Sequence, residues 1–131
     1  MYPADTNIFL EGLLEQKGAA EVRSFFRTID LEKIFITDLS LYSIGIILFR
    51  LRKYALFIPF LEDLFDDGIS ILSLKSSDLK KLPKVAQRFR LDFDDAYQYM
   101  VAEKHQLQLI SFDKDFDGTK RGRKTPAEVM P

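Results

Sequence analysis

The aspartates of this chain are the residues best suited to chemistry, because cysteine is absent and His105 is the single histidine. Asp5 follows a short apolar segment, Asp95 lies in the first turn of a predicted helix, and Asp113 follows the apolar run Leu107–Ser111. Carboxylates that converge repel one another unless they are protonated or bridged by a cation. Three of them together predict a divalent cation, and oxygen ligands favour Mg²⁺ or Mn²⁺ over zinc.

Metal-assisted hydrolysis of a phosphodiester is the chemistry that such a site suits. A bound divalent cation lowers the pKa of water and stabilises charge on the transferred phosphoryl group. The reaction needs no nucleophile from the protein, which agrees with the absence of cysteine and of histidine near the candidate site.

Helix capping is the competing explanation for several of these aspartates, because an aspartate at a helix start commonly accepts a backbone N–H. We expect Asp92 to be a cap, and for Asp94 capping and function stay equally open. Asp95 already lies inside the first turn, where a cap is less useful, so function is favoured there. Asp5 also precedes a predicted helix and is open to the same explanation.

The elements that must position these residues alternate between strands and helices. Apolar runs predict strands at residues 2–4, 34–37, 69–74, 107–111 and, more briefly, 125–129. Helical spacing predicts helices at 6–16, 19–29, 39–51, 54–64, 76–88 and about 92–105. We therefore expect one α/β domain over residues 1–131, a three-layer α/β/α sandwich with a central parallel sheet of four to five strands. Ligands bind beyond the carboxyl ends of such strands, so Asp5 and Asp113 would meet at one edge.

Composition limits the remaining function classes. The chain has 131 residues and a formal net charge of −1, so a nucleic-acid partner would need a local basic patch. It contains no apolar run of membrane-spanning length and opens with no secretory signal, so we expect a cytoplasmic protein with no membrane partner.

Four segments together resemble the motifs of PIN-domain proteins, and their order and spacing agree over essentially the whole chain. They are Asp5–Leu10, Leu91–Tyr97, Leu109–Phe116 and Arg123–Val129. PIN domains resemble small metal-dependent ribonucleases, and many are the VapC-like toxin of a toxin–antitoxin pair. The resemblance implies RNA as substrate, Mg²⁺ or Mn²⁺ as cofactor and a small antitoxin protein as partner.

The resemblance also implies roles for individual residues. The catalytic and metal-binding carboxylates would be Asp5, Asp95 and Asp113, with Asp115 or Asp117 as a further ligand. The polar groups that orient these ligands would be Thr6 or Asn7 and Ser111.

One acidic residue of the family pattern is missing. PIN domains usually place a glutamate on the helix after the second strand, and Ser43 occupies what looks like that position. A neutral serine would weaken Mg²⁺ binding, so a PIN-like binding module without nuclease activity is the alternative function. Asp38 lies about one turn earlier, where a capping role is favoured.

Two further surfaces bear on partners. The basic residues Lys120, Arg121, Arg123 and Lys124 would either meet RNA phosphates or form a solvated loop. The apolar stretch Leu39–Leu51, with the apolar residues of 56–61, exceeds what one small sheet face needs. We expect a homodimer there, and a groove for a partner peptide is the alternative.

Overall fold

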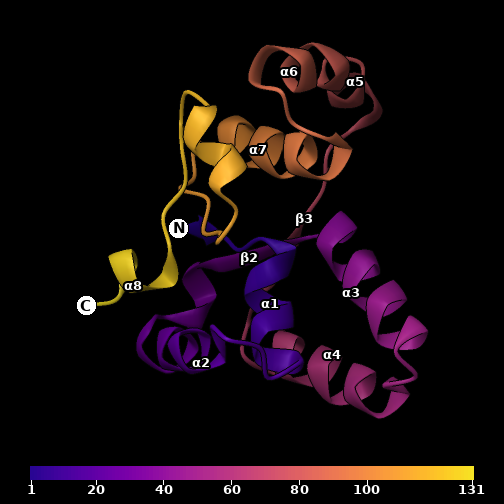
Figure 1. Ribbon diagram of the computed structural model, residues 1–131, viewed down its shortest axis with the longest axis vertical. Coiled ribbons are helices and arrows are strands. Elements are labelled where there is room, and N and C mark those ends of the chain that lie inside the picture. The colour runs from indigo at the N-terminus through magenta and orange to yellow at the C-terminus, as the bar shows by residue number, and fades with distance from the viewer.

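A three-stranded parallel sheet lies at the centre of the computed structural model, which describes residues 1–131 (Figure 1). Strands β1 (Tyr2–Pro3), β2 (Ile34–Thr37) and β3 (Ser70–Leu72) are hydrogen-bonded in the order β1-β2-β3. Tyr2 pairs with Ile34, and Phe35 pairs with Ser70. The predicted parallel sheet is therefore confirmed.

The predicted count of four to five strands is wrong, because the last two segments form only isolated bridges. Ile110 pairs in parallel with Ala4 on the free edge of β1 and with Lys124 on its other side. The segment after Lys124 ends in a helix, α8 (Pro126–Val129), and not in a closing strand. The reason is local, since Thr125 and Glu128 form a capping box and Pro126 occupies the first turn.

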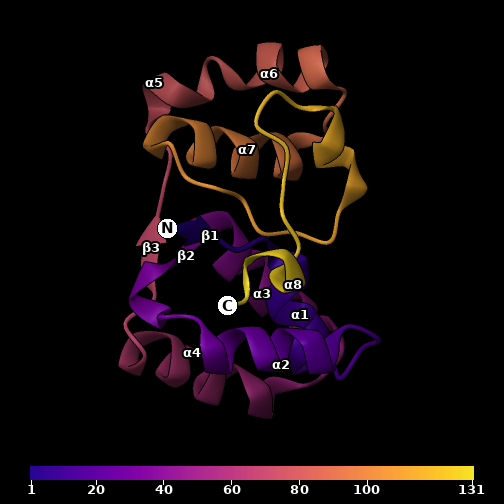
Figure 2. The ribbon, with the colours of Figure 1, turned by 90° about the vertical axis from the view of Figure 1, so that its left-hand side faces the viewer.

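Helices cover both faces of the sheet, which confirms the three layers (Figure 2). One layer contains α1 (Thr6–Leu13), α2 (Ala19–Thr28), α3 (Asp38–Arg50) and α4 (Phe57–Asp66). The other contains α5 (Ser76–Leu79), α6 (Leu82–Phe89) and α7 (Phe93–His105). Short 3₁₀ turns occur at η1 (Leu31–Lys33), η2 (Tyr54–Leu56) and η3 (Lys114–Gly118). None of the helices has the length and apolar character needed to cross a membrane.

Each face of the sheet has its own apolar core. Ile8, Phe25, Ile36 and the α3 residues Ile44 and Leu48 belong to the larger core, under α1 to α4. The second core contains Tyr99 and Val101 of α7, together with Leu82, Leu109 and Phe116. Because α7 contributes buried residues along most of its length, its first turn is held firmly beside the sheet edge.

Side-chain caps fix the starts of α1, α3 and α7. Asp5 Oδ1 accepts the N–H of Thr6 at α1, and Thr37 Oγ1 accepts the N–H of Ser40 at α3. Asp92 Oδ1 accepts the N–H of Asp95, which confirms the predicted cap of α7.

Candidate metal centre

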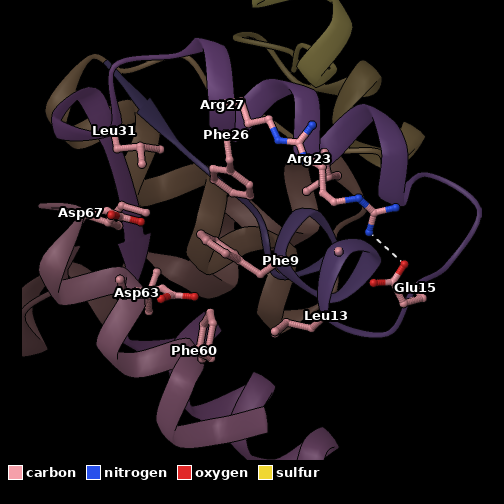
Figure 3. A pocket seen from close by; sticks show the side chains of 14 residues that line it. Phe9, Leu13, Glu15, Arg23, Phe26, Arg27, Leu31, Phe60, Asp63 and Asp67 are labelled. Carbon is pink, nitrogen blue, oxygen red and sulfur yellow. Dashed lines mark hydrogen bonds and ion pairs between the residues drawn. The ribbon is translucent and has the colours of Figure 1, made fainter.

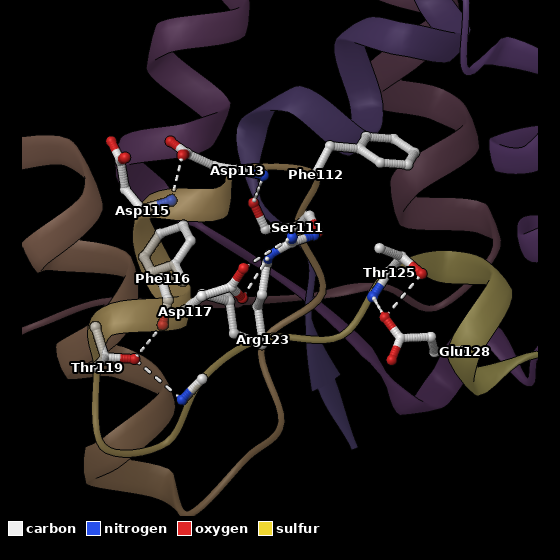
Figure 4. A network of polar contacts seen from close by, with 12 residues as sticks. Ser111, Phe112, Asp113, Asp115, Phe116, Asp117, Thr119, Arg123, Thr125 and Glu128 are labelled. Atoms are coloured by element: carbon white, nitrogen blue, oxygen red, sulfur yellow. Dashed lines mark hydrogen bonds and ion pairs between the residues drawn. The ribbon is translucent and has the colours of Figure 1, made fainter.

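Three carboxylates converge at the carboxyl edge of the sheet. Asp95, Asp113 and Asp115 each offer an oxygen, and these oxygens lie within 4.8 Å of one another. The first turn of α7 supplies Asp95, and the segment after Ile110 supplies the other two. Asp113 caps η3 by accepting the N–H of Asp115 at 2.8 Å, which fixes the pair relative to each other (Figure 4).

The electrostatics of the cluster favour a cation. Burial and, to a smaller extent, the negative charges of Asp113, Asp92 and Asp5 together raise the pKa of Asp95 to about 8. Full ionisation of the cluster at neutral pH therefore needs a positive counter-charge. A set of carboxylate oxygens fits a hard divalent cation such as Mg²⁺ or Mn²⁺.

Asp5 is buried beside this cluster and accepts four hydrogen bonds. Its Oδ1 accepts from the N–H of Thr6 at 2.8 Å and from Gln98 Nε2 at 3.2 Å. Its Oδ2 accepts from Ser111 Oγ at 2.7 Å and from Asn7 Nδ2 at 3.1 Å. Burial raises the pKa of Asp5, and the bonds from Ser111, Thr6 and Gln98 counteract this only in part. The charge of Asp5 therefore acts on Asp95, although Asp5 is not one of the three residues whose oxygens lie within 4.8 Å of one another.

Ser111 connects Asp5 to the metal-binding segment. Its Oγ donates to Asp5 and accepts the N–H of Asp113 at 2.9 Å and Asn7 Nδ2 at 3.2 Å. Asn7 Oδ1 in turn accepts the N–H of Phe112 at 3.2 Å. The structure therefore brings together the supporting residues Asn7 and Ser111 with two of the three predicted carboxylates.

Ser40 and Gln98 also belong to this network, although the sequence analysis did not single them out. The fully buried Ser40 Oγ lies 2.8 Å from Thr6 Oγ1 and accepts a hydrogen bond from Gln98 Nε2. Ser43 lies about one turn further along α3, is only partly buried and takes no part in these contacts. On this helix, Ser40 is thus linked to Asp5 through Thr6 and Gln98.

Sequence spacing did carry a signal for both residues. Ser40, Ile44 and Leu48 recur at every fourth position and form the buried face of α3. The exposed face of this helix is also apolar, and that obscured the pattern. Gln98 follows Asp95 by three positions, which places both on one side of α7. It is a lone uncharged amide in a helix segment that is otherwise apolar and buried.

Two other predicted acidic residues have different partners. Asp38 Oδ1 accepts the hydroxyl of Tyr97 at 2.6 Å and the N–H of Leu39. Asp117 forms an ion pair with Arg123, whose Nε lies 3.1 Å from Oδ1 of the carboxylate (Figure 4). Asp115, and not Asp117, is therefore the additional carboxylate of the cluster.

The four predicted RNA-binding residues are not equivalent. Arg123 is mostly buried, because it also donates to the carbonyl oxygen of Ser111 at 3.1 Å. Lys120, Arg121 and Lys124 are exposed on the loop that follows η3. Arg121 donates to the carbonyl oxygen of Leu107 at 3.1 Å and remains open to solvent.

The parallel sheet, its helical layers and the acidic edge define a PIN-type α/β fold. The chain belongs to the PIN-domain family, since the model of the PIN domain matches residues 3–122. PIN domains typically depend on a divalent metal, and the acidic cluster lies within the matched region.

Solved structures share the fold at low sequence identity. A toxin–antitoxin complex from Klebsiella pneumoniae has 21% identity and a TM-score of 0.77, with 96% of this chain and 98% of that chain covered. The sarcin-ricin-loop-cleaving toxin VapC20 of Mycobacterium tuberculosis has 14% identity and a TM-score of 0.81 over the full length of both chains. FitAcB from Neisseria gonorrhoeae has 16% identity and a TM-score of 0.73, with 98% of this chain and all of that chain covered. No curated protein matches the sequence.

Proposed function

We propose that this protein is a metal-dependent endoribonuclease that hydrolyses phosphodiester bonds of RNA. The convergence of Asp95, Asp113 and Asp115 within 4.8 Å is the observation that carries the proposal. Membership of the PIN-domain family supports it, and so does the description of the similar VapC20 as a toxin that cleaves the sarcin-ricin loop.

The three clustered carboxylates would hold Mg²⁺ or Mn²⁺. When bound, the cation supplies an acidified water for attack and stabilises charge on the phosphoryl group. Asp95 would have to be ionised to hold the cation, and its pKa of about 8 means that it would give up a proton at neutral pH. Ser111 would hold the Asp113 backbone in place by accepting its N–H, and Asp5 would add negative charge that acts on Asp95.

Exposed cations on the neighbouring loop would bind the RNA backbone. Lys120, Arg121 and Lys124 follow η3, which carries the clustered Asp115. Contacts between such side chains and phosphates supply affinity without reading the base sequence. Arg123 would shape this loop, because its guanidinium is already engaged by Asp117 and the Ser111 carbonyl.

An antitoxin would be the partner of this chain, since the similar structure from Klebsiella pneumoniae is a toxin–antitoxin complex. The groove between α1, α2 and α4 would receive it (Figure 3). Its floor is aromatic, with Phe9, Phe26 and Phe60. Its rim carries both signs of charge, including Arg27 and Asp63, and a 2.8 Å ion pair joins Arg23 to Glu15. An amphipathic antitoxin segment with charges along its edges matches this arrangement.

The exposed face of α3 and α4 would bind a second copy of the chain. Large apolar side chains gather on it, namely Tyr42, Ile46, Phe49, Ile58 and Phe65, which are each more than half exposed. A hollow between the two helices is lined by apolar residues and by Arg50 as its single charged residue. Such a face favours a self-complementary partner over a charged peptide.

A binding module without nuclease activity is the second candidate function. It is favoured by Ser43, a neutral residue at what looks like the position of the family's glutamate, and by the neutral Ser40, which contacts Thr6 and Gln98 and adds no carboxylate to the site. Incubation of the purified protein with RNA in Mn²⁺, Mg²⁺ or EDTA tests which function holds, because only the nuclease gives metal-dependent cleavage.

A further inference from the structure

We infer that Phe93 is a stacking platform for one unpaired base of the RNA, beside the acidic cluster. The inference rests on the proposed function, because it names the class of substrate that reaches the same site, namely single-stranded RNA. It gives a role to an exposed aromatic ring that metal-assisted hydrolysis does not itself require.

Phe93 lies at the acidic edge of the sheet. It is the first residue of α7, directly after the cap Asp92 and two positions before Asp95, and its exposed fraction is 55%. Residues two positions apart in a helix have their Cα atoms about 5–6 Å from each other, on different sides of one turn. A nucleotide that brings its phosphate to the cluster therefore brings its own base or the next one close to Phe93.

The location of Phe93 sets it apart from the other exposed aromatic side chains. All the others belong to α3, η2 or α4, in the opposite helical layer, namely Tyr42, Phe49, Tyr54 and Phe65. Phe93 stands alone between two exposed aspartates, Asp92 and Asp94. A single ring in acidic surroundings is too small for a protein interface, and its area matches that of one base.

Tyr97 holds the ring of Phe93 in place. The two rings are stacked, with centroids 6.4 Å apart and an angle of 29° between their planes. Tyr97 is buried, and its hydroxyl donates to Asp38 Oδ1 at 2.6 Å and accepts the N–H of Leu74 at 2.9 Å. The exposed surface of Phe93 thus lies away from Tyr97, on a ring whose support is fixed by two hydrogen bonds. Little side-chain entropy is lost when a base stacks on such a ring.

Exposed cations precede and follow this platform. Arg90 lies three positions before Phe93, and Lys75 comes directly after the residue whose N–H the Tyr97 hydroxyl accepts. Proteins that bind single strands combine aromatic rings with positive charges along the strand. Phosphates next to the stacked base would meet these two cations, which offsets the repulsion from the acidic first turn of α7.

Stacking on Phe93 selects the state of the RNA and not its sequence. A base inside a double helix has both faces covered by its neighbours, so only an unpaired base can lie on the ring. Every base has a π-face, so the preference among bases is weak. We therefore expect the protein to favour single-stranded over double-stranded RNA.

Binding of a short single-stranded uridine oligonucleotide tests this assignment without cleavage. The full-length Asp113→Asn protein is the parent, because we expect it to leave RNA intact, and fluorescence anisotropy gives its affinity for the RNA. Adding Phe93→Leu should weaken binding about fivefold or more through the lost stacking, whereas adding Phe93→Trp should keep it. Adding Phe65→Leu is the matched control, because Phe65 is 56% exposed and lies on α4 outside the site.

A spectroscopic readout separates stacking from a general loss of structure. One central uridine is replaced by 2-aminopurine, a purine that stacks more strongly than uracil and loses fluorescence on an aromatic ring. Binding by the parent and by Phe93→Trp should quench it, and saturating Phe93→Leu should not. Circular dichroism establishes that each variant is folded.

Two results would overturn the inference. One is equal RNA affinity of folded Phe93→Leu and its parent, and the other is 2-aminopurine that stays fully fluorescent in the complex with the parent. Either would leave the proposed nuclease intact, since its test is metal-dependent cleavage by the wild type.

The KM for single-stranded RNA gives the same comparison if Asp113→Asn binds too weakly to titrate. Relative to the wild type, Phe93→Leu should raise KM about fivefold or more, and an unchanged KM would overturn the inference. A wild type that neither binds nor cleaves RNA would instead overturn the proposed function, and the inference with it.

Discussion

Ser111 Oγ donates a 2.7 Å hydrogen bond to Asp5 Oδ2, although 106 positions separate the two residues in the chain. The same hydroxyl accepts the backbone N–H of Asp113 at 2.9 Å. One small side chain therefore holds together the start of α1 and the segment that supplies two carboxylates of the cluster. Both bonds are at the carboxyl edge of the sheet, where Ala4 and Ile110 pair.

Ser111→Ala should reduce both stability and activity. The change leaves Asp5 one donor short and the Asp113 N–H without its acceptor, and both groups lie in a largely buried region. The free energy of unfolding, measured in urea, should fall by about 1–3 kcal/mol. RNA cleavage should fall as well, because Asp113 loses its support.

Ser77→Ala is the control for that experiment, since Ser77 is exposed and lies far from the cluster in sequence. It should leave both the urea midpoint and cleavage unchanged. Equal stability of Ser111→Ala and Ser77→Ala would show that the Ser111 hydroxyl holds neither segment in place.

The metal-free protein should lose stability as the pH rises from about 4 to about 8. The ordinary pKa of an aspartate is 3.8, and the fold raises the pKa of Asp95 to about 8. Between these two pH values the folded state therefore binds more protons than the unfolded state. The free energy of unfolding therefore falls with rising pH and levels off above the folded pKa. Asp95→Asn should flatten this slope, and Asp94→Asn should keep it, in urea titrations made with EDTA present.

Cation binding should release a proton below pH 8. Since Asp95 must ionise to act as a ligand, about one proton should leave per Mn²⁺ bound at pH 6 and far less at pH 9. Calorimetry in two buffers of different ionisation enthalpy gives this number directly. Proton release that stays the same in Asp95→Asn would show that another group supplies the proton.

The α3 and α4 face should hold a dimer together. Ile46→Glu places a charge in the middle of the exposed apolar face, so light scattering after size exclusion should show a monomer in place of a dimer. Leu79→Glu is the matched control on α5, because Leu79 is also exposed and lies in the other helical layer. A wild type that elutes as a monomer would refute the dimer.

The helices and β2 could be predicted from sequence because their apolar residues recur at the spacing of the element that they form. β2 begins and ends at the predicted residues Ile34 and Thr37, and the Asp92 cap lies where expected. The predicted helix over 76–88 is divided into α5 and α6 because Pro83 lies in the first turn of α6. The predicted strand at residues 107–111 forms only isolated bridges through Ile110. The length of such a strand depends on pairing with distant segments, which local sequence does not encode.

The candidate site was predictable where a carboxylate follows a strand or lies in the first turn of a helix, and less so where a neutral side chain takes part. Asp95 and Asp113 were predicted from their positions at a helix start and after a strand. Asp115 was predicted, as an alternative to Asp117, from its place in the family motif that contains Asp113. Ser40 and Gln98 act through contacts across 58 positions of the chain, and no local pattern indicates that such residues meet. The sequence alone also does not show which side of the apolar helix α3 faces the site, so the contacts of Ser40 could not be predicted from it.

Cleavage of an end-labelled single-stranded RNA is the measurement that tests the central claim most directly. Purified wild type would be compared with Asp113→Asn and Asp94→Asn in Mn²⁺, in Mg²⁺ and in EDTA. We predict endonucleolytic cleavage by the wild type and by Asp94→Asn in at least one of the two metals, and none in EDTA or by Asp113→Asn. Cleavage that persists in EDTA, or a wild type no more active than Asp113→Asn in excess Mn²⁺, would contradict the account.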